Sequence, residues 1–222
     1  IPMLPDPRAG GAELPPRLEE APPGRVIFLG LQGSYRRGEA TEESDIDIVA
    51  VLDAVDTAAL DAYRAAVGSM PRGELACGFL CGRAELLRWP RFDLLQLVLD
   101  TEPIRGGWEG LLPAFSPDDT EEAVRVGASA LYHAAVHAYL YGGGLAPGLA
   151  GLSKSVFFLL RLQVFRRTGC YCINRAELAD CLEGPEEARL FSLCRGDLVG
   201  SDHCEAKSLY GTLLACASGL MA

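Results

Sequence analysis

The apolar residues follow two different patterns along this 222-residue chain. In the first half they form short runs, at residues 26–29 and again at 46–52, where Asp47 is the one polar residue, and these runs end at glycines or charged residues. Such runs, without polar alternation, are typical of strands that are buried on both faces. From residue 118 onward the apolar positions recur with helical spacing, and strand signals almost disappear. The pattern therefore predicts an α+β chain, with a first half that mixes strands and helices and a second half that is helical.

Glycine, proline and capping residues place the other elements of the first half. A helix is expected to begin at Thr57, which can cap it, and to end before Gly68. Gly78 interrupts a third expected strand, and Pro90 occupies the first turn of a second helix that runs through Asp100. The expected ranges are 57–67 for the first helix, 75–80 for the third strand and 103–105 for a final extended segment.

The second half is expected to contain four helices. Their predicted ranges are 118–141, 150–168, 174–195 with a break near Gly184-Pro185, and 202–220. The change of pattern places a domain boundary near residues 106–118. We therefore expect a Pro/Gly-rich leader over 1–24 with at most one short helix, a first domain over 25–107 and a helical domain over 108–222.

The composition of the chain limits which partners the protein is expected to bind and where in the cell it is expected to be. The formal net charge of −10 argues against a surface that grips nucleic acid, since an acidic protein repels the polyanion, whereas it suits a cationic small molecule. No apolar stretch reaches the roughly 18 uncharged residues needed to span a bilayer, so we expect no membrane partner and a cytoplasmic location. The eight cysteines are scattered without a CxxC pair, which favours buried, reduced thiols over a zinc ribbon or a disulfide scaffold.

The most informative segment joins Gly33-Ser34 to the triplet Asp45-Ile46-Asp47. A glycine after the first strand lets backbone amides approach phosphate oxygens, and the Ser34 hydroxyl can donate to them. Asp45 and Asp47 are two residues apart at the head of a strand, so their side chains project to one face with Cα atoms about 6.6 Å apart. Carboxylates this close repel each other, and a proton or a hard cation such as Mg²⁺ relieves the repulsion.

The order of these features along the chain makes the motif more specific than its parts. An Asp-x-Asp triplet alone arises by chance about once in a chain with this many aspartates. Here it follows a buried strand, a Gly-Ser pair and a short linker, and it heads a second buried strand. The alternative interpretation is an acidic turn at a capped strand entry.

At Gly33, Ser34, Asp45 and Asp47 the sequence resembles the nucleotidyltransferase superfamily of the DNA polymerase beta type. Within it, the chain is similar to the small bacterial antibiotic adenylyltransferases, which act on aminoglycosides and lincosamides, and to minimal nucleotidyltransferases. The resemblance is strong over residues 25–55 and weaker as far as residue 106. It implies a small mixed twisted sheet with flanking helices, and two Mg²⁺ ions on the aspartates. It also implies attack of an acceptor hydroxyl on the α-phosphate of ATP or another nucleoside triphosphate, with release of pyrophosphate.

A third carboxylate is the point at which the sequence departs from this superfamily. Members usually supply it from a later strand, as a metal ligand or as the base for the acceptor hydroxyl. The candidate strand has no acid in its interior, and Glu74 at its start is the residue that fits. We therefore assign Glu74 as base and third metal ligand; the alternative is a solvated glutamate at a strand entry. A general base contributes about 10²–10⁴-fold in rate, so this residue bears on whether turnover is efficient.

Four further residues complete the expected nucleotide site. Arg36 and Arg37 directly follow the Gly-Ser pair, and Ser44 precedes the first aspartate. Lys154, one of two lysines in the chain, could neutralise a phosphate as a flexible point charge. The alternative interpretations are a solvated arginine pair and an exposed cation at the start of a helix.

Three functions remain open from the sequence. The first is adenylyl transfer to a hydroxyl of a small molecule, for which the helical half resembles the accessory domain that holds the acceptor, with a cleft between the halves lined partly by acids. The second is transfer of AMP to a protein, a reaction for which the resemblance points to shorter single-domain chains. The third is a nucleotide-binding regulatory protein without turnover. The sequence names neither the acceptor nor the oligomeric state.

Overall fold

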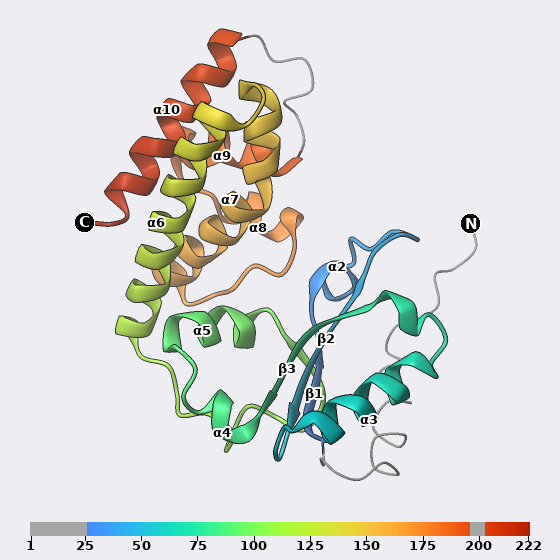
Figure 1. Cartoon of the computed structure of the whole chain (residues 1–222). Helices are drawn as coiled ribbons and strands as arrows, with labels where there is room; N and C mark the ends of the chain where they lie inside the picture. Colours follow the sequence, from blue (N-terminus) through green and yellow to red (C-terminus); the bar gives the residue numbers. More distant parts are fainter. Residues whose placement is uncertain (1–25, 196–202) are drawn as a thin grey trace. The chain divides into compact units, whose positions relative to one another are not determined.

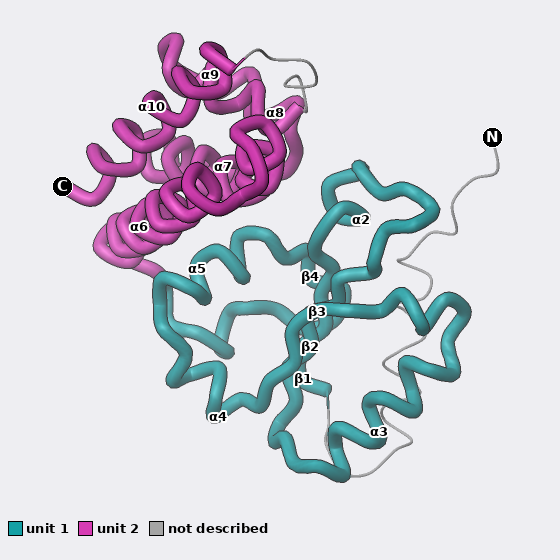
Figure 2. The backbone as a smooth tube through the Cα atoms, turned by 45° about the horizontal axis from the view of Figure 1, so that its top comes forward, with its two compact units in different colours: residues 1–114 teal, residues 115–222 magenta. Residues whose placement is uncertain are grey.

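The computed structural model describes residues 26–195 and 203–222, so the leader expected over 1–24 lies outside the described residues. The described residues form two compact units, one within residues 26–114 and the other within residues 115–195 and 203–222 (Figure 2). The first unit contains the sheet and its helices, and the described part of the second is helical. The predicted α+β class is confirmed.

A four-stranded mixed sheet organises the first unit, in the order β3-β2-β1-β4. Strand β1 pairs antiparallel with both β2 and β4, whereas β2 and β3 run parallel. The two central strands are the apolar runs, and both are largely buried. The strands are β1 (Val26–Leu31), β2 (Ile46–Leu52), β3 (Ala76–Gly82) and β4 (Glu102–Arg105).

Helices α3 and α5 lie on opposite sides of this sheet (Figures 1 and 2). On the α3 side, alternate β2 residues such as Ile48 and Ala50 pack with Ala59 and Ala66 of the helix in one apolar cluster. Because side chains alternate along a strand, the residues between them face the other side of the sheet. The helical segments are α2 (Gly33–Arg37), α3 (Thr57–Gly68), a 3-10 turn η1 (Gly73–Leu75), α4 (Arg83–Leu86) and α5 (Arg91–Leu99).

Two bounds in this unit differ from the sequence prediction. The cap of α3 is Asp56 and not Thr57, because the Asp56 carboxylate accepts a 2.8 Å hydrogen bond from the Ala59 amide. The third strand begins at Ala76, since the preceding residues close the 3-10 turn η1. Helices α2 and α4 were not expected, and at five and four residues they are too short to show helical periodicity.

The second unit is built from helices α6 to α10. Pro117 occupies the first turn of α6, and Ser116 and Asp119 form a capping box at its start. Helix α7 begins at Leu145, five residues before the predicted start, and contains Pro147 in its first turn. The break predicted near Gly184-Pro185 is present just before Gly184, between α8 and α9. The bounds are α6 (Pro117–Tyr141), α7 (Leu145–Thr168), α8 (Arg175–Cys181), α9 (Gly184–Arg195) and α10 (His203–Gly219).

Helix α7 is the central helix of this unit and packs against α6, α9 and α10. By length and composition it could cross a membrane, a test that the core helix of a globular unit also passes. It carries the fully buried Arg161, whose Nε donates to the Cys172 carbonyl at 2.6 Å and whose guanidinium lies over the Tyr171 ring at 4.1 Å. Its packing against the neighbouring helices accounts for its apolar composition.

Candidate active site

Gly33 and Asp47 are in direct contact, although 14 positions separate them in the sequence. Gly33 has φ of +71°, a left-handed conformation that costs other residues about 1–2 kcal/mol. A Cβ atom at this position would overlap the Asp47 carboxylate. The neighbouring Gln32 amide donates to the Asp47 carbonyl at 2.8 Å. The first half of the motif is therefore held against the second.

Ser34 lies in α2, directly after this contact. The segment is closed at its other end by Gly38 in the left-handed region, and the Glu39 amide donates to the Ser34 carbonyl at 2.9 Å. The Ser34 side chain is partly exposed. The structure thus places a short helical turn where the sequence predicts a phosphate-binding loop.

The two aspartates occupy different environments at the head of β2. Asp45 precedes the strand and is exposed, whereas Asp47 is the second strand residue and is half-buried. Ile46 and Ile48 pack on the α3 side, so Asp47 faces the opposite side of the sheet. Carboxylate oxygens suit Mg²⁺, which commonly uses one or two carboxylates together with substrate phosphates. The donor set therefore fits that ion.

The neighbouring strand brings a thiol, and no carboxylate, beside Asp47. In the parallel ladder Asp47 pairs with Cys77, and paired residues of such a ladder project to the same face. Glu74 lies in the turn η1, before the strand, and is exposed. Within residues 26–195 and 203–222, no three His, Cys, Asp or Glu residues form a group that could hold a metal ion. The role predicted for Glu74 stays a prediction.

Arg36 and Arg37 face a carboxylate that the sequence did not single out. Arg36 Nη1 lies 3.2 Å from Asp100 Oδ1, and Arg37 Nη1 lies 3.5 Å from Asp100 Oδ2. Arg37 Nε also lies 3.3 Å from Glu39 Oε2. Both arginine side chains are mostly buried in these ion pairs, so they are not the solvated pair of the alternative interpretation.

The linker that carries Ser44 is held by Arg72, which was also not predicted. Arg72 is the non-glycine residue with positive φ (60°) among the described residues. It donates to the Tyr35 hydroxyl at 3.0 Å and to the Glu42 carbonyl at 2.8 Å. The Ser44 hydroxyl accepts from the Thr41 amide at 2.9 Å, which closes a turn before the aspartates.

Lys154 lies within α7 of the second unit and is exposed. It is nine residues after the start of that helix, so it is not the helix-start cation of the alternative interpretation. Its predicted contact with a phosphate stays a prediction.

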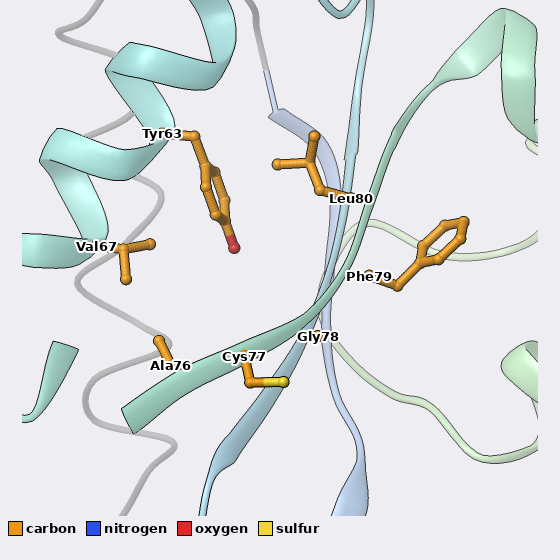
Figure 3. Close-up of a pocket in the computed structure, with 7 residues that line it drawn as sticks. All are labelled: Tyr63, Val67, Ala76, Cys77, Gly78, Phe79 and Leu80. Carbon is orange, nitrogen blue, oxygen red and sulfur yellow. The ribbon is translucent and has the colours of Figure 1, made fainter. Parts of the chain in front are cut away.

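A pocket of about 180 Å³ opens between α3 and β3 (Figure 3). Tyr63 and Val67 of α3 form one wall, and Ala76 and Leu80 belong to the facing strand. Burial raises the pKa of the Tyr63 phenol to about 12, so the hydroxyl stays protonated at neutral pH. The remaining lining residues are Cys77, Gly78 and Phe79, so the residue that pairs with Asp47 on β3 also borders this pocket.

Comparisons with known proteins agree with this geometry. Residues 13–102 match the family model of the nucleotidyltransferase domain. Among solved structures, the chain is similar to a spectinomycin adenyltransferase, AAD(9), from Enterococcus faecialis, at 14% sequence identity and a TM-score of 0.53. The match covers 94% of this chain and 98% of that one, so the likeness in fold includes the helical half. The comparison with curated proteins found no match. Residues 13–102 therefore carry a nucleotidyltransferase domain, and the chain as a whole is similar in fold to an antibiotic adenylyltransferase.

Proposed function

We propose that this protein transfers the adenylyl group of ATP to a hydroxyl group of a small molecule. The observation that carries the proposal is the contact between Gly33 and Asp47, which joins the two halves of the predicted motif at one end of the sheet. The nucleotidyltransferase family match over residues 13–102 supports the reaction class. ATP is the proposed donor because the structural neighbour was crystallised with it.

Each residue of the motif has a proposed role. Asp45 and Asp47 would hold two Mg²⁺ ions together with the triphosphate, and Ser34 with the amides around Gly33 would donate hydrogen bonds to the outer phosphates. Bound magnesium would neutralise charge that develops on the phosphate oxygens during transfer. Glu74 takes the proton of the acceptor hydroxyl.

A small molecule is the proposed acceptor. The structural neighbour was crystallised with spectinomycin, and its likeness to this chain in fold extends through the helical half. A net charge of −10 favours a cationic acceptor. One observation favours a second candidate function, a nucleotide-binding protein without turnover: the residue paired with Asp47 on β3 is Cys77 and not a carboxylate.

Calorimetry and a pyrophosphate assay together test the proposal. We expect the full chain to bind ATP in the presence of Mg²⁺, and to release pyrophosphate when an aminoglycoside, a lincosamide or spectinomycin is added. Binding without pyrophosphate release across such a panel would favour the regulatory function. Pyrophosphate release with transfer of label to a protein would favour the protein-modifying alternative. Absence of ATP binding would rule out all three.

The source of the base can be tested with two substitutions. If Glu74 takes the proton, Glu74→Gln should lower kcat by about 10²-fold, at the lower end of the range for general bases. Cys77→Asp places a carboxylate beside Asp47 and should then give no gain in kcat, since the base is already present. Steady-state pyrophosphate release measures both variants. If Glu74→Gln leaves kcat unchanged and Cys77→Asp raises it, Glu74 is not the general base, and the position at which a base is lacking is that of Cys77 on β3.

A further inference from the structure

The carboxyl end of α5 is occupied by side chains from the segment around α2. The last turn of a helix leaves carbonyl groups without partners inside the helix, and it carries partial negative charge. Here the Gln32 side-chain amide donates to the Leu97 carbonyl at 3.0 Å. Arg36 Nη1 donates to the Leu99 carbonyl at 2.9 Å. Two of these terminal carbonyls are therefore bound by residues more than 60 positions earlier in the chain.

Asp100 adds a full negative charge at the same place. It directly follows α5, is 5% exposed, and lies 3.2 Å from Arg36 and 3.5 Å from Arg37 on its two carboxylate oxygens. A helix end and a buried carboxylate together favour two cations, and neither cation reaches this place unless α2 is folded against α5. The ion pairs therefore hold α2 against the carboxyl end of α5.

We propose that Asp100 is a positioning residue for the triphosphate site: through Arg36 and Arg37 it fixes α2, and with it Gly33 and Ser34, before the nucleotide binds. This inference rests on the proposed function, and it replaces direct phosphate contact as the main role of the two arginines. Preorganisation lowers the cost of ordering a binding segment, so loss of Asp100 weakens nucleotide binding without removing a ligand of the nucleotide.

Removal of the Asp100 charge should change ATP affinity in opposite directions for the two possible roles of Arg36 and Arg37, phosphate contact and positioning of α2. If Arg36 and Arg37 contacted the phosphates directly, removal of the Asp100 charge would release both cations and would strengthen ATP binding. If Asp100 positions α2, the same change weakens binding. Asp100→Asn keeps the size of the side chain and removes its charge. Asp61→Asn is the matched control, because Asp61 is an exposed residue of α3 with a surface pair to Arg64.

The first measurement is independent of nucleotide. We expect hydrogen exchange in peptides covering residues 32–39 to be at least about tenfold faster in Asp100→Asn than in the wild type, because the Glu39 amide is protected by the Ser34 carbonyl in the fixed segment. Exchange in peptides of β2 should stay the same, and Asp61→Asn should behave as the wild type. Arg36→Gln, which keeps the Asp100 charge, should show the same local change if Asp100→Asn is too unstable to study.

The second measurement is ATP affinity and kinetics with Mg²⁺. We expect Asp100→Asn to raise the Kd and the KM for ATP about tenfold with little change in kcat. A purely structural defect would lower the concentration of active enzyme, and so the apparent kcat, without changing KM. Unchanged or tighter ATP binding, or unchanged exchange over residues 32–39, would overturn the proposal. A wild-type chain that binds no ATP would overturn the proposed function, while the exchange data would still show whether Asp100 holds α2.

Discussion

Asp47→Asn should reduce nucleotidyl transfer by at least about 10³-fold while leaving the fold intact. Removal of one preorganised group that stabilises transition-state charge typically costs about 10²–10³-fold. Asp47 adds to this a second role, since its carboxylate is packed against Gly33 and its backbone carbonyl accepts from Gln32. Asparagine keeps the shape of the side chain but supplies a neutral amide, which is a poorer ligand for Mg²⁺. Label transfer from ATP to an acceptor measures the effect.

The control for this variant is Asp61→Asn, which removes an exposed carboxylate of α3 and should keep wild-type turnover. Circular dichroism and thermal unfolding establish that Asp47→Asn is folded, so that lost activity is not lost protein. In the proposed mechanism the affinity for ATP in the absence of Mg²⁺ should change little, since the carboxylate acts through the metal ions. If the turnover of Asp47→Asn stays within a few-fold of the wild type, Asp47 is not required for catalysis.

The parts of the fold that the sequence predicts are those with a local signature. The runs that became β1 and β2 are apolar except for Asp47, because these central strands are largely buried. The helices of the second unit are long enough for periodicity and caps to define them, and predicted starts and ends differ from the structure by only a few residues for most of them. The short helix α2 has neither signal, so the sequence shows only a loop there.

Contacts between distant segments could not be predicted in the same way. Asp100 is 64 residues from Arg36, and nothing in the neighbouring sequence marks it as anything other than the end of a helix. The pairing of Asp47 with Cys77 depends on the register of β2 and β3, which is set by packing over the whole strand. One signal was present: Gly33 precedes Ser34 where a positive φ suits a turn, and the structure shows that the missing side chain also makes room for Asp47.

Gly33→Ala should remove activity to an extent comparable with Asp47→Asn and should also destabilise the protein. The new methyl group meets two obstacles, a left-handed backbone and the Asp47 carboxylate. The first costs about 1–2 kcal/mol, and forced overpacking adds about 1–3 kcal/mol. Displacement of a reacting group by about 1 Å alone costs about 10²-fold, and here both halves of the motif are displaced. Turnover and urea unfolding measure the two effects.

Gly38→Ala separates these two obstacles, because Gly38 closes the same turn. Its φ of +69° nearly equals that of Gly33, but a Cβ atom there meets nothing within 4 Å. Gly38→Ala should therefore show only the conformational cost of about 1–2 kcal/mol and keep most of its activity. In an Asp47→Ala background, the excess destabilisation by Gly33→Ala should largely disappear, since the carboxylate it strikes is gone. Equal losses of stability for the two glycine variants, in both backgrounds, would mean that the contact between Gly33 and Asp47 does not constrain the site.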